Sequence, residues 1–243
     1  MCFHTSQIQA VKKLEEHYQV QLSEESQRDL FDQARYHING FTHAQLLIIP
    51  QEKPSILASA TWGIAPENKK VQDLKAYYKE AVKFGGGLNA RSEKAFVHFL
   101  YKKSIFKKRC IIPVSAFFEP HEHQKKKYPF VFKPKENTTF SLAGIYTQIE
   151  NVITFTILTQ EASPLFARIH NQKKRQPLLL NNELSKKWLS TDLQESEIKK
   201  ILVSKYDQAK LEHHPISKDL FQPKVNSDIE SILDQVNYED LSI

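Results

Sequence analysis

The sequence has little cysteine and no long apolar segment, and both features exclude classes of protein. Only two cysteines, Cys2 and Cys110, occur in 243 residues, which is too few for the disulfide framework of a small secreted domain. No apolar run approaches the roughly 20 residues that a membrane-spanning helix needs. No apolar segment typical of a signal peptide follows Met1. We therefore expect a cytoplasmic protein that makes no contact with a membrane.

The chain also lacks the usual sequence patterns of nucleotide and metal sites. It has 6 glycines, and the run of three at 85–87 does not match a phosphate-binding loop. Four histidines come in two close pairs, but neither pair has a partner at the spacing of zinc ligands: His121, His123, His213 and His214. We therefore expect neither a metal nor a cofactor.

What the sequence does contain is an uneven distribution of positive charge. The net charge is +6, yet residues 69–135 hold 17 Lys and Arg against 5 Asp and Glu, whereas residues 183–243 hold 8 against 12. Three basic triplets lie at 107–109, 125–127 and 173–175. Such clusters attract a polyanion such as nucleic acid. For a single triplet, a solvated, lysine-rich surface is the more common explanation. Three triplets, each beside one of the motifs described below, favour a face that binds nucleic acid.

Apolar periodicity and turn residues divide the chain into helices and strands. We expect helices at 6–18, 26–36, 71–82, 93–103, 164–170, 182–190 and 194–204. We expect strands at 44–50, 56–64, 109–120, 128–134, 139–150, 152–161 and 176–180. Because the strands and helices come in separate blocks and do not alternate, the pattern favours an α+β fold over a doubly wound sheet.

Cys2 occupies a position that gives it chemistry unavailable to an internal cysteine. If Met1 is removed, residue 2 carries an α-amine and a thiol on adjacent carbons. The amine, with a pKa near 8, can condense with an aldehyde to an imine. The thiolate can then close on the imine carbon to form a thiazolidine ring. Position alone also allows this cysteine to be incidental.

Four further residues are of the types that such chemistry requires. His170 can transfer protons near neutral pH, and Glu119 follows two phenylalanines that would desolvate its carboxylate. Asn89 offers both a donor and an acceptor, and Arg91 can hold a phosphate with two hydrogen bonds. Each segment also has a structural interpretation. His170 would cap a helix, Glu119 would mark where a strand leaves the core, and residues 85–87 would end one helix.

Several motifs, taken in order, resemble the SRAP family (SOS response-associated peptidase, or abasic-site processing, proteins). They are Cys2 after Met1, "WGIAP" (62–66), "LNARSE" (88–93), "RCIIPVSAFFE" (109–119), "LAGIY" (142–146) and "HNQKKRQP" (170–177). The resemblance runs from residue 2 to 180. It implies a single compact α+β domain over residues 1–225, with a barrel-like, mostly antiparallel sheet flanked by helices, and a C-terminal tail at 226–243.

The resemblance also implies a function, an abasic-site sensor that crosslinks to single-stranded DNA through a thiazolidine. Cys2 would be the nucleophile, Asn89 would position its α-amine, and Glu119 and His170 would transfer protons. The expected DNA contacts are Arg91, Trp62, Lys108, Arg109, Lys173, Lys174 and Arg175. The protein would be a monomer, associated with the nucleoid when bound to DNA.

The sequence departs from the family at positions beside the expected site. Phe3 and His4 replace the usual Gly-Arg after Cys2, Asn68 replaces an aromatic residue, Pro120 replaces a Trp, and Gln176 replaces a Met. These changes affect DNA stacking and groove shape. Two alternatives therefore stay open. One is a peptidase-like activity, limited to Met1 removal or wider, and the other is a non-catalytic single-strand-binding module.

Overall fold

Two β-sheets organise the chain, and the computed structural model describes residues 2–136 and 138–241. The strands are β1 (His4–Gln7), β2 (Gln21–Leu22), β3 (Arg35–Asn39), β4 (Gln45–Pro50), β5 (Ile56–Trp62), β6 (Asn89–Arg91), β7 (Arg109–Val114), β8 (Ala116–His123), β9 (Lys126–Pro134), β10 (Phe140–Ile149), β11 (Val152–Glu161), β12 (Arg175–Pro177), β13 (Leu179–Leu180) and β14 (Leu211–Pro215). The helices are α1 (Val11–Tyr18), α2 (Arg28–Phe31), α3 (Leu74–Ala81), α4 (Ser104–Lys107), α5 (Pro164–Ile169), α6 (Asn182–Trp188) and α7 (Glu195–Leu202).

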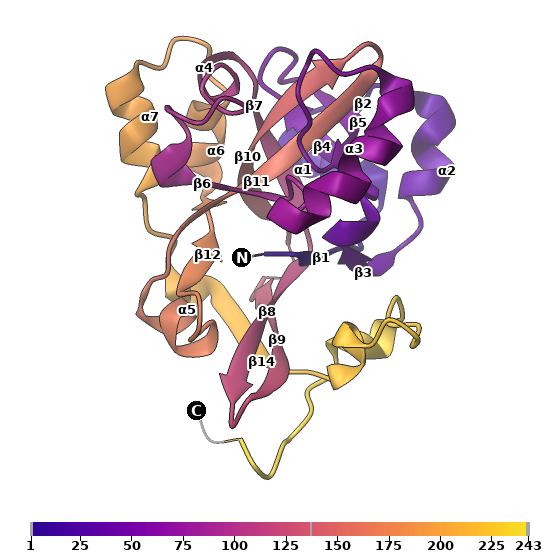
Figure 1. Cartoon of the computed structure of the whole chain (residues 1–243), viewed down its shortest axis with the longest axis vertical. Coiled ribbons are helices and arrows are strands. Elements are labelled where there is room, and N and C mark those ends of the chain that lie inside the picture. Colours follow the sequence, from indigo (N-terminus) through magenta and orange to yellow (C-terminus); the bar gives the residue numbers. More distant parts are fainter. Residues whose placement is uncertain (1, 137, 242–243) are drawn as a thin grey trace.

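The larger sheet closes into a five-stranded barrel. β5, β4, β7, β10 and β11 pair in that order, each with its neighbour antiparallel. β11 then returns to pair parallel with β5, with Phe155 opposite Trp62. Helices lie outside this barrel (Figure 1). The expected α+β fold with a barrel-like, mostly antiparallel sheet is confirmed.

The smaller sheet is antiparallel, with the strand order β14-β9-β8-β1-β3. The chain passes from the barrel into this sheet at Ser115, between β7 and β8. The backbone N–H of Ser115 donates to the carbonyl of Ser6, and its hydroxyl accepts from the N–H of Ile8. The single strand expected over 109–120 is therefore wrong. It is two strands, one in each sheet.

The two sheets share a core rich in aromatic side chains. Trp62, Phe117, Phe132 and Phe155 are fully buried. The ring of Phe132 stacks on those of Phe117 and Phe166, with centroids 5.1 and 4.6 Å apart. Phe166 belongs to α5, so this packing holds α5 against the smaller sheet and fixes the residues that follow the helix.

Some of the expected helices are confirmed and others are wrong. The helix at 71–82 is confirmed as α3 with short helical turns at both ends, and Gly85 follows it with a φ of +87°. The expected start at residue 6 is wrong, because residues 4–7 form β1 and pair with two distant strands. Likewise β3 begins inside the helix expected at 26–36. Residues 95–103 form turns, where the buried Ala95 and Tyr101 lie six apart, which is not the spacing of a helix face.

Residues after 225 are joined to the smaller sheet by hydrogen bonds. A carboxylate oxygen of Asp228 accepts from the backbone N–H groups of Tyr36 (2.6 Å) and His37 (3.0 Å), and its partner oxygen pairs with Arg35. The hydroxyl of Tyr128 donates to Asp240 over 2.5 Å. The boundary between domain and tail at residue 225 stays a prediction. No helix formed by residues 2–136 and 138–241 is long and apolar enough to cross a bilayer.

Candidate active site

The smaller sheet fixes the N-terminal residues inside the molecule. β1 lies between β8 and β3, and His4 is opposite Phe118 on one side and Asn39 on the other. Cys2 lies two residues before the start of this strand and has no exposed surface. In Figure 1 the N-terminal end lies between the barrel and the smaller sheet. Cys2 is therefore held at a defined position beside Glu119, which follows Phe118 in β8.

Asn89 contacts Cys2 from the barrel side. It begins β6, which pairs parallel with β11, and its Nδ2 donates to the Cys2 carbonyl over 2.8 Å. That bond orients the amide, because only its nitrogen can donate to a carbonyl. The amide oxygen of Asn89 is buried and has no hydrogen-bond donor among the described residues. The site therefore holds a buried acceptor next to the Cys2 backbone.

Glu119 and His170 form the other side of the site. The Glu119 side chain is fully buried, and its Oε2 lies 3.0 Å from Nδ1 of His170. The same Nδ1 lies 2.9 Å from the Arg175 carbonyl oxygen, which can only accept. Nδ1 therefore carries a hydrogen.

Burial controls the charge of the Cys2 thiol. Desolvation raises the pKa of Cys2 well above its usual value, and the negative charge of Glu119 raises it further. The thiol donates a weak hydrogen bond to the His4 carbonyl, with a sulfur–oxygen distance of 3.6 Å. Since the thiolate is the nucleophilic form, the thiol needs a base before it can react. The structure thus brings Cys2, Asn89, Glu119 and His170 together.

Trp62 supports the site from within the core, and its expected contact with DNA is wrong. The side chain is fully buried, and its indole N–H donates to the Leu88 carbonyl over 2.9 Å. In the next residues of the motif, the N–H of Ile64 donates to the Gly87 carbonyl. Both bonds fix the backbone just before Asn89, so the "WGIAP" motif positions Asn89.

Two of the expected basic contacts also face inward. Arg109 is fully buried, and its guanidinium donates to the carbonyls of Ile105, Trp188 and Ser190. Arg175 is nearly buried and holds Glu93 with two hydrogen bonds of 2.6 and 3.0 Å. Their expected DNA contacts are therefore corrected to structural roles, because the fold buries both guanidinium groups and holds them with hydrogen bonds inside the protein.

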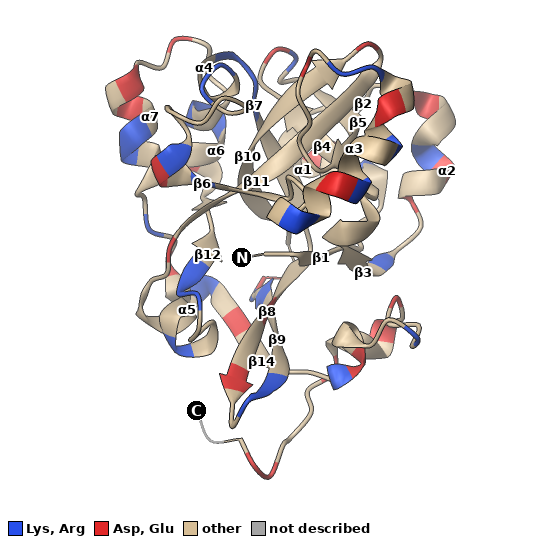
Figure 2. Ribbon diagram, in the orientation of Figure 1, with Lys and Arg blue, Asp and Glu red and all other residues tan. Residues whose placement is uncertain are grey.

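The remaining basic residues are more accessible. Lys108 is half-buried and pairs with Glu67 over 2.6 Å, whereas Arg91, Lys173 and Lys174 are exposed. Figure 2 shows basic ribbon at the start of β12, beside α5, on the side where the N-terminal end lies. A contact with DNA stays a prediction for these four residues.

A cavity of about 1000 Å³ opens beside the site and includes His170 in its wall. The sequence had pointed to Phe3, His4, Pro120 and Lys173 of its lining, but gave no sign of His37, Phe41 and Phe221. Nothing in the sequence connects residue 221 with residue 4, because the two meet only in the folded chain.

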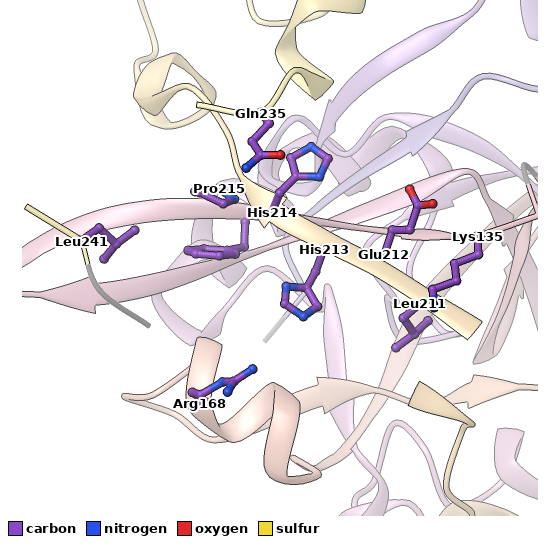
Figure 3. A pocket seen from close by; sticks show the side chains of 10 residues that line it. Lys135, Arg168, Leu211, Glu212, His213, His214, Pro215, Gln235 and Leu241 are labelled. Carbon is purple, nitrogen blue, oxygen red and sulfur yellow. The ribbon is translucent and has the colours of Figure 1, made fainter. Parts of the chain in front are cut away.

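A second hollow of about 570 Å³ lies along β14, away from these residues (Figure 3). His213 and Arg168 face one another across it, whereas His214 points to the opposite side, toward Gln235. Burial and then the positive charge of Arg168 lower the pKa of His213. None of the predicted site residues lines this hollow. Within residues 2–136 and 138–241, no three His, Cys, Asp or Glu side chains are arranged to bind a metal.

Comparisons with known proteins find relatives of this chain in sequence and in fold. A family model described as SOS response associated peptidase (SRAP) matches residues 1–223. The abasic site processing protein YoqW of Bacillus subtilis is 30% identical over 188 residues, which are 75% of this chain and 79% of that protein. The abasic site processing protein YoaM of the same organism is 29% identical over 79% of this chain and 82% of its own length. The crystal structure of a protein from Bacteroides thetaiotaomicron superimposes with a TM-score of 0.83 at 28% identity, covering 97% of this chain and 100% of that one.

Proposed function

Since this chain belongs to the SRAP family, we propose that it forms a covalent thiazolidine crosslink with abasic sites in single-stranded DNA. Cys2 makes the crosslink after Met1, which lies outside the described residues, has been removed. Relatives that share about 30% of their sequence are named abasic site processing proteins. Their names support the target, and the arrangement around Cys2 supports the chemistry.

The proposed reaction uses both groups of the N-terminal cysteine. The α-amine adds to the aldehyde carbon of the ring-opened abasic sugar, and loss of water gives an imine. The thiolate then adds to the imine carbon, and the imine nitrogen takes up a proton to complete the thiazolidine. One water leaves and no oxidant is needed. Because burial keeps the thiol protonated, a nearby base must accept its proton before the second step.

The neighbouring side chains are suited to these steps. Glu119 and His170, with Oε2 and Nδ1 3.0 Å apart, can pass protons to and from the sugar oxygen and the imine. Arg91 is exposed at the end of β6, two residues from Asn89, where it can hold a phosphate of the DNA. Lys173 and Lys174, also exposed, can attract the strand.

The single observation that carries the proposal is the amide of Asn89. Its nitrogen already holds the Cys2 carbonyl, and its oxygen is a buried acceptor without a donor among the described residues. An unpaired buried acceptor is costly. The α-amine that appears when Met1 is removed would supply the donor. The same hydrogen bond would hold that amine beside Glu119.

The test is a denaturing gel of the protein incubated with a single-stranded oligonucleotide that contains one abasic site. Intact mass first establishes that Met1 is absent. We expect a slow-migrating covalent product with the wild type and with Cys110→Ala, because Cys110 is buried in the barrel core. We expect none with Cys2→Ala. A product that survives in Cys2→Ala, or no product with the processed wild type, would refute the proposal.

A further inference from the structure

The cavity beside the reaction site has two aromatic walls. Phe3 and Phe41 form one wall, with ring centroids 5.0 Å apart. His4 and Phe221 form another, with centroids 5.5 Å apart. Phe41 is 40% exposed although it lines a hollow, and Phe3 and Phe221 are partly buried. Aromatic faces left open in this way favour a planar ligand.

A chain of hydrogen bonds ends at this cavity. Nδ1 of His4 lies 2.8 Å from Nε2 of His37, and Nδ1 of His37 lies 2.6 Å from the Ser227 hydroxyl. Burial lowers the pKa of His4 to about 3 and that of His37 to about 4, so both rings are neutral at physiological pH. Between neutral rings, each of these hydrogen bonds can be donated in either direction. The second nitrogen of His4 is then a donor in one direction and an acceptor in the other.

Charges at the cavity suit a phosphate at its mouth more than an anion inside it. Lys127 and Lys173 are exposed and belong to its lining, together with one carboxylate, Glu122. The other lining carboxylate, Asp228, is paired with Arg35 over 3.1 Å. The rest of the lining is uncharged, with aromatic, aliphatic, hydroxyl and amide side chains. A ligand with a flat, neutral body and a phosphate at its edge therefore matches the site.

We propose that this cavity binds the nucleobase of the nucleotide adjacent to the abasic site, stacked between the two aromatic walls. The inference rests on the proposed function, because the lesion must first lie at Cys2. The cavity shares His170 with that site, so the nucleotide joined to the reacting sugar is the one that reaches it. Because stacking tolerates any base and His4 offers either a donor or an acceptor, the pocket selects for the presence of a base and not for its identity.

The test compares crosslinking rates on three single-stranded oligonucleotides with one abasic site each. The first carries normal bases on both sides of the lesion. The second and third carry an inert tetrahydrofuran spacer, which has no base, as the 5′ or the 3′ neighbour. Base stacking on an aromatic residue contributes roughly five- to a hundredfold. We therefore expect one spacer, on one side only, to slow crosslinking by about tenfold, and the four bases at that position to react alike.

Phe41→Ala and Phe221→Ala should slow crosslinking on the normal strand and abolish the difference between strands. Phe106→Ala is the matched control, because Phe106 is 37% exposed and packs on another phenylalanine, Phe96, with centroids 5.5 Å apart, yet does not line the cavity. It should behave as the wild type. Equal rates on all three strands, or equal effects of Phe41→Ala and Phe106→Ala, would overturn the subsite while leaving the crosslink intact. Absence of crosslinking on every strand would instead refute the proposed function and the subsite with it.

Discussion

His4 and His37 lie side by side in the smaller sheet and are both neutral in the folded protein. For each ring, burial is the main cause of its low pKa. His37 lowers the pKa of His4 further. The charges that act on His37 oppose each other, since Asp228 raises its pKa and Arg35 lowers it. In the unfolded chain both rings titrate near 6.5, so unfolding below that pH takes up protons.

The first prediction is a loss of stability in acid that originates at these histidines. A depressed folded-state pKa contributes stability that is complete above pH 6.5 and is lost as the pH falls toward about 4 for His37 and about 3 for His4. Each ring adds at most about 1.4 kcal/mol per pH unit to that slope. Denaturant unfolding at several pH values between 4 and 7 measures the slope of the unfolding free energy.

His4→Gln should make that slope shallower by up to about 1.4 kcal/mol per pH unit, because glutamine can hydrogen-bond but does not titrate. His17→Gln is the control, since His17 is exposed on α1. If both variants follow the wild-type slope, the buried histidine pair is not the source of the acid sensitivity.

Burial is also what the two cysteines have in common, so it cannot explain why one would react. Desolvation raises the thiol pKa of both Cys2 and Cys110. Glu119 raises the thiol pKa of Cys2 further, and Asn89 holds the Cys2 carbonyl. The reactivity proposed for Cys2 therefore comes from its polar neighbours and its place at the terminus. The thiol itself is not intrinsically acidic.

At the scale of elements, the glycine run between α3 and β6 determines where Asn89 lies. Gly87 has a φ of +68°, and a Cβ on it would lie 2.6 Å from the Ile64 carbonyl oxygen. Gly85 also has a positive φ, of +87°, but a Cβ there would meet no atom within 4 Å. Alanine would suffer backbone strain at either position, but its Cβ would clash with the backbone only at position 87.

The second prediction uses that difference. Gly87→Ala should destabilise the fold by about 2–4 kcal/mol, because backbone strain and a backbone clash add together. It should also slow crosslinking, since Asn89 lies two residues on. Gly85→Ala should cost only about 1 kcal/mol and leave the crosslinking rate close to that of the wild type. Chemical denaturation and the gel assay measure the two effects. Similar losses in both variants would show that space at Gly87 is unimportant.

Elements with a clear local pattern were predictable, and those defined by distant partners were not. β10 and β11 are two mostly apolar segments separated only by Glu150 and Asn151, and the structure joins them there in a two-residue turn, with Ile149 opposite Val152. β1 is only four residues long and exists because β3 and β8 lie on either side of it. No local pattern could reveal it.

In the candidate site, too, residues marked by a local motif were predictable and those defined by the fold were not. Motifs identified Cys2, Asn89, Glu119 and His170, which the structure brings together. Charge alone could not separate Arg109, which the fold buries, from Lys173, which it exposes. The aromatic cavity could not be predicted from the sequence either, because its walls come from segments far apart in the chain.

At the scale of the whole molecule, the distribution of exposed charge should govern how DNA is attracted. The net charge of +6 is shared among many lysines, but few of them are near the site. Lys173 and Lys174 follow α5 and are exposed, and Lys173 lines the cavity beside Cys2. Lys199 and Lys200 are also exposed, on α7, which lies at the upper left of Figure 2, above β12 and α5.

The last prediction compares these two lysine pairs by the salt dependence of single-strand binding. Each phosphate contact contributes about −0.7 to the slope of log K against log salt concentration. Removing Lys173 and Lys174 together should make the slope shallower by about 1.4, because both lie where the strand must pass to reach Cys2. Fluorescence anisotropy in a Cys2→Ala background measures binding without a crosslink. Lys199→Ala with Lys200→Ala removes the same charge from α7, whose lysines do not line the cavity, and should leave the slope unchanged. If both double variants change the slope equally, the net charge of the protein attracts the strand. The predicted contact of the strand with Lys173 and Lys174 would then be wrong.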